Sequence, residues 1–149
     1  MERASWNWGL ALIALTVAIH ALGVVVMALI EIRIRVGLEN RRLGPRFLIP
    51  IVVCVIGAAG LLLAVLHGIE AMIWAEAYVW LGALGSRVDA MLYSLDSITT
   101  RGASGLMLEQ RWRLMGALEA ADGMLLFGIS TAYMFAVLQV YWPMLSRRD

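Results

Sequence analysis

The amino-acid sequence predicts an all-α integral membrane protein with three transmembrane helices. Hydrophobic residues make up 62% of the 149 residues and charged residues 15%, against about 45–50% and about 25% in soluble domains. Three long stretches carry no charge, and all 12 basic residues are arginines. This composition excludes a disordered chain, a secreted disulfide scaffold and a typical soluble enzyme. The net charge of +1 argues against a nucleic-acid partner.

The first predicted span is the uncharged stretch from Trp6 to Ile30, with Gly9–Ile30 as its apolar centre. These 22 residues would form a helix of about 33 Å, enough to cross a hydrocarbon core of about 30 Å. The stretch is too long for the apolar region of a signal peptide, so we expect an uncleaved anchor. His20 is the only titratable residue inside it, and we expect it to make a hydrogen bond between helices rather than bind a metal or relay protons.

A charged segment, Glu31–Arg46, separates the first span from the second and is expected to be a linker broken at Gly44-Pro45. Residues 1–46 are thus the N-terminal helix with its linker, and residues 47–149 form a second unit. The second span is Phe47–Leu66, and the third is Gly123–Ser146.

The arginines set the predicted orientation. Five of the 12 lie in the linker and two follow the third span, which the positive-inside rule places in the cytoplasm. The N-terminus is then outside, the C-terminus is cytoplasmic, and the segment His67–Asp122 faces outward.

This outer segment continues the second helix, so that an outer helix is expected over residues 47–84. His67, Glu70 and Trp74 share one face of it. The expected role of His67 and Glu70 is to bond each other or a neighbouring helix; the alternative is a metal site completed by neighbouring chains. Gly82–Ser86 should break the helix, and Arg87–Ile98 should form a short second one with an apolar stripe.

A small-residue loop, residues 99–105, separates this short helix from an inner helix expected over residues 114–146. A short helix and a non-helical loop at membrane depth need cover from protein or a water-filled cavity, and one chain of this size cannot provide it. The layout therefore predicts a homo-oligomer around a central axis, with a re-entrant loop in each chain. The sequence shows no catalytic arrangement of nucleophile and base, so we do not expect an enzyme.

The stretch Tyr93-Ser94-Leu95-Asp96-Ser97-Ile98-Thr99-Thr100-x-Gly102 resembles the pore helix and filter entry of tetrameric potassium channels. With other matches between Leu66 and Trp142, it resembles the bacterial two-pore-domain potassium-channel-like family. The resemblance implies a pore-loop fold in the bacterial inner (plasma) membrane, a homotetramer, a pore helix over residues 87–98 and a filter loop over 99–105. A pentamer is the alternative. The implied ion pathway is Thr99, Thr100, Arg101, Gly102, Ala103 and Ser104, supported by Asp96 and Tyr93, with Ser130 and Thr131 lining the cavity.

The filter departs from the family pattern at four positions. Arg101 replaces Val or Leu, Ala103 replaces Tyr, Ser104 replaces Gly, and Gly105 replaces Asp. Since filter carbonyls replace the hydration shell of K⁺, strict potassium selectivity is not expected. The transported ion is open among K⁺, Na⁺ and Ca²⁺, and no cofactor or resident metal is expected. The resemblance thus implies a homo-oligomeric ion channel that passes ions, expected to be cations, through the atypical filter Thr99–Gly105. The alternative function is a non-conducting membrane scaffold or partner subunit.

Arg101 needs a partner if it points behind the filter, because an uncompensated buried charge is very costly. We therefore predict an Asp96–Arg101 ion pair, within or between chains; the alternatives are an arginine facing the axis and a solvated one. Glu109, Glu119 and Asp122 are expected to lie outside the membrane as acidic rings that concentrate cations; the alternative is that Arg111 and Arg113 neutralise them.

Overall fold

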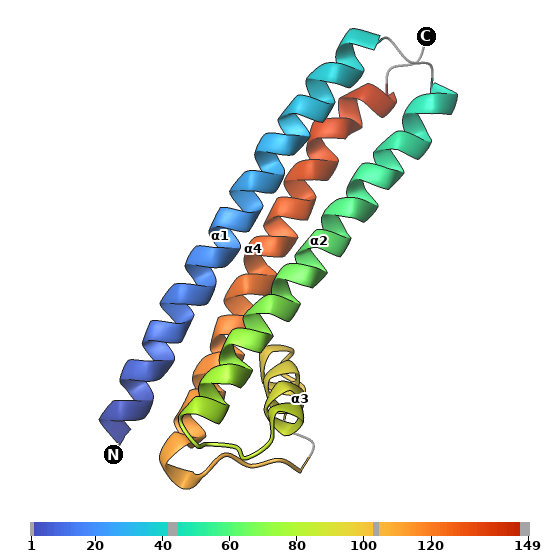
Figure 1. The fold of residues 1–149 in the computed structure, drawn as a ribbon. Coiled ribbons are helices and arrows are strands. Elements are labelled where there is room, and N and C mark those ends of the chain that lie inside the picture. The colour runs from blue at the N-terminus through green and yellow to red at the C-terminus, as the bar shows by residue number, and fades with distance from the viewer. Residues whose placement is uncertain (1, 42–44, 103–104, 147–149) are drawn as a thin grey trace.

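The computed structural model describes residues 2–41, 45–102 and 105–146. Three long helices lie side by side: α1 (Glu2–Arg41), α2 (Pro45–Trp80) and α4 (Arg113–Ser146). A short helix, α3 (Arg87–Ile98), and one 3₁₀ turn (Gln110–Trp112) lie between α2 and α4 in the sequence. Figure 1 shows that α1 and α4 run in the same direction and α2 in the opposite one. All regular structure in the described residues is helical, as predicted.

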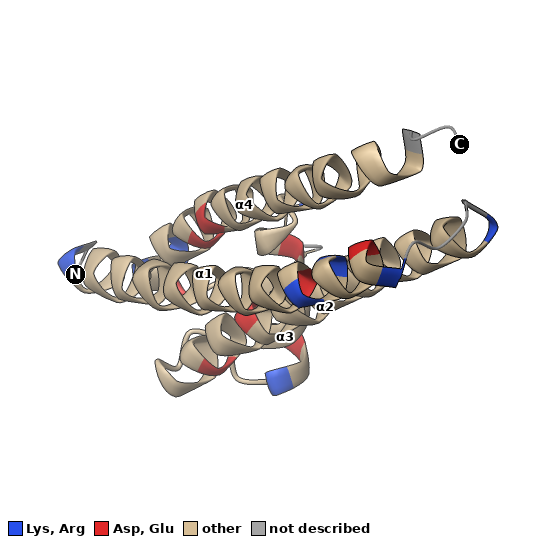
Figure 2. Ribbon diagram, turned by 90° about the horizontal axis from the view of Figure 1, so that it is seen from above, with Lys and Arg blue, Asp and Glu red and all other residues tan. Residues whose placement is uncertain are grey.

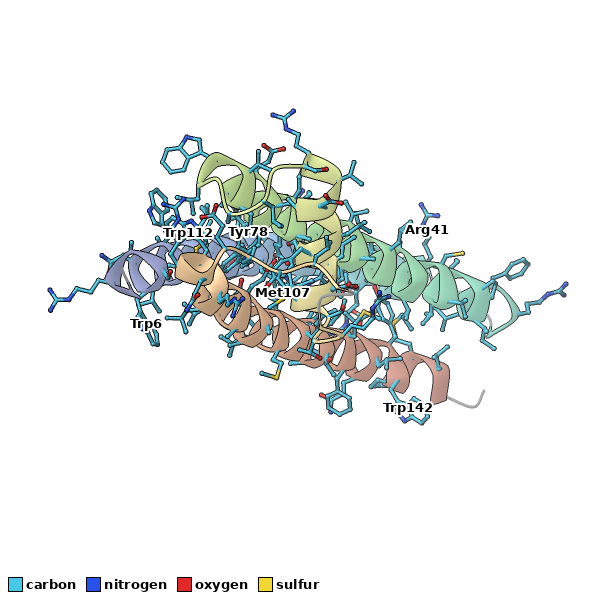
Figure 3. All side chains as sticks on the ribbon, turned by 90° about the horizontal axis from the view of Figure 1, so that it is seen from below. Trp6, Arg41, Tyr78, Met107, Trp112 and Trp142 are labelled. Atoms are coloured by element: carbon cyan, nitrogen blue, oxygen red, sulfur yellow. The ribbon has the colours of Figure 1, made fainter. Side chains whose placement is uncertain are left out.

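The three long helices are each apolar and long enough to cross a membrane. They have 40, 36 and 34 residues, and at about 1.5 Å per residue each exceeds the thickness of a hydrocarbon core. Large apolar side chains cover their outer surfaces, and Trp6 and Trp142, at opposite ends of the bundle, point away from the other helices (Figure 3). The chain is therefore a multi-pass membrane protein.

The predicted linker is helical over residues 31–41, because α1 continues through them without a break. Arg35 and Glu39 form an i,i+4 ion pair with an N–O distance of 2.9 Å, and such pairs stabilise an exposed helix. Figure 2 shows basic and acidic positions in this part of α1. The Gly44 half of the predicted break lies outside the described residues, and α2 begins at Pro45, where the missing N–H of proline costs nothing.

The end of α2 is four residues earlier than predicted, at Trp80 instead of Leu84. Gly82 has a φ of +67°, which glycine adopts without strain. The N–H of Ala83 donates to the Tyr78 carbonyl at 2.8 Å and that of Gly82 to Val79 at 3.0 Å. This is the glycine-terminated helix end known as the Schellman motif, so the helix stops at the local signal and not where the apolar run ends.

The bounds of α3 agree with the predicted pore helix. The Ser86 side chain accepts a hydrogen bond from the Asp89 N–H, a standard N-cap contact. Ala90, near the start of α3, packs beside Trp74 and Tyr78 of α2, whereas Ile98, at its end, packs with Ala71 and Leu126. The helix therefore runs from the ends of α2 and α4 toward their middles (Figure 1).

The first helix packs chiefly against α4. Gly9 lies against the side chain of Leu118, and Gly23 lies against Leu66 of α2. Small residues at these points let helices approach closely, as is usual for helix packing in membranes. In this way α1 covers one side of the α2–α4 pair, and α3 lies against both of those helices.

Candidate functional site: an exposed polar turn and a buried polar network

The predicted Asp96–Arg101 ion pair is present, and it forms within one chain. Arg101 Nε lies 3.0 Å from Asp96 Oδ1, and a second guanidinium nitrogen lies 3.4 Å from Oδ2. The Asp96 carboxylate is buried, while the Arg101 side chain is 69% exposed. The backbone N–H of Arg101 also donates to the Asp96 carbonyl at 2.9 Å. Asp96 therefore holds the turn after α3 through both its side chain and its backbone.

The turn that follows α3 is exposed over Thr99, Thr100, Arg101 and Gly102. Thr99 Oγ1 donates to the Leu95 carbonyl at 2.6 Å, so its hydroxyl closes the helix end. Thr100 has a φ of +57° and Gly102 one of +82°; positive φ is uncommon for threonine and easy for glycine. Ala103 and Ser104, the rest of the predicted ion pathway, lie outside the described residues.

Tyr93 supports α3 itself and not the turn after it. Its ring packs edge-on against Tyr78, with centroids 5.4 Å apart, and its hydroxyl lies against Gly116 of α4. Burial, the largest cause, raises the pKa of the Tyr93 phenol. Its predicted role as filter support thus reduces to fixing the position of the short helix.

The cavity-lining prediction does not hold for Ser130 within the protomer. Ser130 is buried, and its Oγ lies 3.1 Å from His20 Nε2 and 3.1 Å from His67 Nε2. Thr131, the next residue of α4, is exposed and donates to the Phe127 carbonyl at 2.8 Å. Ser130 therefore belongs to the interior of the bundle, where it joins two other helices.

Four side chains from α1, α2 and α4 form a closed ring: His20, His67, Glu70 and Ser130. His20 Nδ1 lies 2.8 Å from Glu70 Oε1, and His67 Nδ1 lies 3.2 Å from Glu70 Oε2. Ser130 closes the ring on the Nε2 side of both imidazoles. His20 and Glu70 are fully buried, and His67 also stacks on Phe127 at a centroid distance of 4.3 Å. The expectation that His20, His67 and Glu70 bond neighbouring helices is confirmed.

Toward the α3 end of the bundle, Asp122 forms a second polar group. Its Oδ2 accepts hydrogen bonds from Thr16 Oγ1 at 2.6 Å and from Trp74 Nε1 at 3.0 Å. Trp74 lies one helical turn beyond Glu70 on α2, and Thr16 lies one turn from His20 on α1. The second group therefore lies one helical turn from the ring that contains His20 and Glu70.

Glu119 of α4 forms the third polar group with Tyr78, which lies one turn beyond Trp74 on α2. Tyr78 donates to Glu119 Oε2 at 2.7 Å, and Ser94 of α3 donates to Oε1. Glu119 and Asp122 are both fully buried, so the prediction that they form outer acidic rings is wrong. Of the three acids named there, Glu109 alone is exposed, and it pairs with Arg111 at 2.9 Å.

The three buried carboxylates of Glu70, Asp122 and Glu119 face no buried arginine in the described part of the chain, where every arginine is exposed. Figure 2 shows that the acidic positions of α4 lie away from the end that leads to the C-terminus. Ionisable side chains inside transmembrane helices are rare and commonly mark ion or proton sites. The arrangement can hold a cation near the histidines, because two imidazoles and a carboxylate converge there.

Sequence reasoning did not bring His20 and His67 together, because 47 residues separate them. One signal was available in the spacing of residues on α2. Three side chains that can form hydrogen bonds recur at intervals of four and so share one face of the helix: Glu70, Trp74 and Tyr78. No family model, curated protein or solved structure matches this chain.

Proposed function

We propose that the protein is a homo-oligomeric ion channel of the pore-loop class, in which the turn Thr99–Gly102 borders the ion path. One observation carries the proposal: this exposed polar turn lies beside two membrane-crossing helices, several turns in from their ends. Ile98, just before it, packs with Ala71 and Leu126. These residues are 9 and 13 positions from the α3-side ends of α2 and α4, or about 14 and 20 Å along the helices.

A polar turn at that level cannot face lipid. Unsatisfied backbone groups and an arginine side chain are costly in hydrocarbon, and non-helical backbone at that depth is found where protein or water covers it. The single chain leaves Thr99, Thr100 and Arg101 exposed. Further copies of the chain, arranged around an axis beside this turn, would supply both the cover and a water-filled path.

The outer face of α3 gives further support. Val88 is 69% exposed and Leu92 is 52% exposed, so an apolar stripe of this short helix has no partner among the described residues. In an oligomer the stripe would pack against the neighbouring copy. The C-terminal end of α3 carries a partial negative charge of about half a unit, and several such ends around an axis favour a cation.

Arg101 determines which ions would pass. Unpaired arginines about 8 Å apart around an axis would repel each other by about 2 kcal/mol per neighbouring pair at an effective dielectric of about 20, and would repel cations. The ion pair with Asp96 offsets this charge. We therefore propose a pore for cations without strict K⁺ selectivity, with K⁺, Na⁺ and Ca²⁺ all to be tested.

The second candidate is a non-conducting scaffold or partner subunit of the same fold. It is favoured by the arginine at a filter position and by the pairing of that arginine within its own chain. The two candidates share the oligomer and differ in ion flux.

Flux into liposomes decides between them. Purified protein is reconstituted and exposed to gradients of K⁺, Na⁺, Ca²⁺ and Cl⁻. A Thr99→Cys variant in a Cys54→Ala background should lose flux on treatment with a bulky thiol reagent, because Cys54 is the chain's single native cysteine. The matched control is Cys54→Ala alone, which should be insensitive to the reagent. Absence of flux for all four ions would contradict the channel and support the scaffold.

A further inference from the structure

We propose that His20, His67 and Glu70 form a binding site for a divalent transition-metal ion such as Zn²⁺, held between α1 and α2 inside the bundle. This site is separate from the exposed turn and does not depend on ion conduction. Two imidazoles and one carboxylate are ligands that Zn²⁺ commonly takes. All three residues belong to a single chain, so no neighbouring copy is needed to complete the set.

The ligand atoms are already close enough for one ion. One atom from each of the three residues can be chosen so that all lie within 4.8 Å of one another. In a tetrahedral site with bonds of about 2.0–2.1 Å, ligand atoms lie about 3.3 Å apart. The contacts of Glu70 with His20, at 2.8 Å, and with His67, at 3.2 Å, are near that spacing. Glu70 thus already lies near both imidazoles at about the spacing of a bound site.

Counting hydrogens shows which contact of this ring is open to a cation. Four contacts join the ring: two between imidazole Nδ1 atoms and the Glu70 carboxylate, and two between imidazole Nε2 atoms and Ser130 Oγ. Two neutral imidazoles supply two N–H groups and Ser130 supplies one O–H, while a carboxylate supplies none. These three hydrogens fill the three hydrogen bonds of the ring and leave the fourth contact, between His67 Nδ1 and Glu70 Oε2, without one. Two lone pairs then face each other at 3.2 Å, and a positive centre between them, a proton or a metal ion, would remove their repulsion.

The geometry at His67 favours a metal ion over a proton. His67 Nδ1 and Glu70 Oε2 lie 3.2 Å apart, yet neither atom has a hydrogen-bond partner among the described residues although both are buried. A hydrogen bond needs the N–H to point at its acceptor, whereas a metal ion needs only that the lone pairs converge on it. Glu70 has no solvent exposure, so water does not satisfy its second oxygen.

The surroundings fit the bound form. With the ion on the Nδ1 side, both Nε2–H groups would donate to Ser130 Oγ, which lies 3.1 Å from each. Ligating histidines commonly donate their second N–H in this way, which fixes the ring orientation. The carboxylates of Glu70 and nearby Asp122, which interact electrostatically, would together balance the two charges of the ion and avoid an uncompensated charge inside the bundle.

Metal content measured on the full chain tests the site. The protein is purified in detergent with a tag free of histidine, stripped with a chelator, equilibrated with Zn²⁺ or Co²⁺, and separated from free ion. We expect about one Zn²⁺ per chain by elemental analysis, and for Co²⁺ the strong visible absorption of a four-coordinate site. His67→Gln and Glu70→Gln should lose this stoichiometric ion. Ser130→Ala should bind it about 10–100-fold more weakly.

Glu76→Gln is the matched control, because Glu76 is an exposed acid on the same helix, and it should bind as the unchanged chain does. Retention of the ion by His67→Gln and Glu70→Gln would overturn the proposal. So would a lack of Zn²⁺ and of the Co²⁺ bands in the unchanged protein, which would mean that the ring holds only a proton. Since that measurement uses the unchanged chain, misfolded variants would not block the test. Liposome flux is measured separately, so the channel and the metal site can fail independently.

Discussion

Gly123 of α4 lies directly against the carbonyl oxygen of Ile98, the last residue of α3. A methyl group on Gly123 would overlap that oxygen, which is rigid backbone and cannot rotate away. This contact brings the end of α3 onto the surface of α4 and so sets the position of the turn Thr99–Gly102. A single glycine thus allows the end of α3 to approach α4 this closely.

The substitution Gly123→Ala should therefore displace α3. Forcing a methyl group into a closely packed contact costs typically about 1–3 kcal/mol, and we expect a lower thermal midpoint together with reduced flux. Gly128→Ala, on the same helix, is the control because a Cβ there meets no atom within 4 Å. Equal thermal midpoints for the two variants would show that the Ile98 contact does not fix α3.

Loss of the Asp96 charge should loosen the turn after α3. Asp96→Asn keeps the shape of the side chain but removes the partner of Arg101, so we expect faster hydrogen exchange at residues 99–102 and altered ion selectivity. Asp89→Asn, in the first turn of the same helix, should change only the helix-end electrostatics, worth about 0.3–1 kcal/mol. Identical exchange in the two variants would contradict the bracing role of Asp96.

The hydroxyl of Tyr78 should stabilise the fold through the Glu119 carboxylate. Tyr78→Phe removes a donor at 2.7 Å from a fully buried acid, and leaving such a group short of a partner costs about 1–3 kcal/mol. Tyr141→Phe is matched in chemistry, because the buried Tyr141 hydroxyl has no hydrogen-bond partner among the described residues, and it should cost less than about 0.5 kcal/mol. Denaturant titration in detergent measures both, and a Tyr141 effect as large as that of Tyr78 would refute the assignment.

Thr16 should anchor α1 to α4. Thr16→Val is close in shape and removes the hydrogen bond to Asp122 Oδ2 at 2.6 Å, so we expect a loss of about 1–3 kcal/mol. Thr131→Val removes an exposed hydroxyl that bonds only its own helix and should be nearly neutral. Crosslinking of cysteines introduced on α1 and α4 reports whether α1 separates; unchanged crosslinking in Thr16→Val would count against the anchor.

The helices were predictable because their signals are local. Apolar run length predicts the three spans, and Gly82 with Ser86 marks the break before α3. The Asp96–Arg101 pair was predictable for the same reason, since five residues separate its members. The charged linker was expected to break at Gly44-Pro45, and its helical part was not predicted: arginines and glutamates at helical spacing continue α1 to Arg41.

The buried network was not predictable because its contacts join distant segments. Glu119 and Asp122 lie near the start of the last span, where acids are normally solvated. Their burial depends on Ser94 of α3 and Thr16 of α1, which no spacing rule connects to α4. The ring around Ser130 likewise requires α1, a helix outside the two-span unit of the resemblance.

The acids of α4 have a consequence for how the nascent protein enters the bilayer. An aspartate at the centre of an isolated helix disfavours insertion by about 2.5–3.5 kcal/mol, and the described hydrogen-bond donors to Asp122 and Glu119 all lie on other helices. The ribosome delivers α4 after α1, α2 and α3, so these donors have already been synthesised when the acidic helix emerges. Biogenesis should therefore depend on the order of synthesis, with α4 partitioning fully into lipid only beside its earlier neighbours.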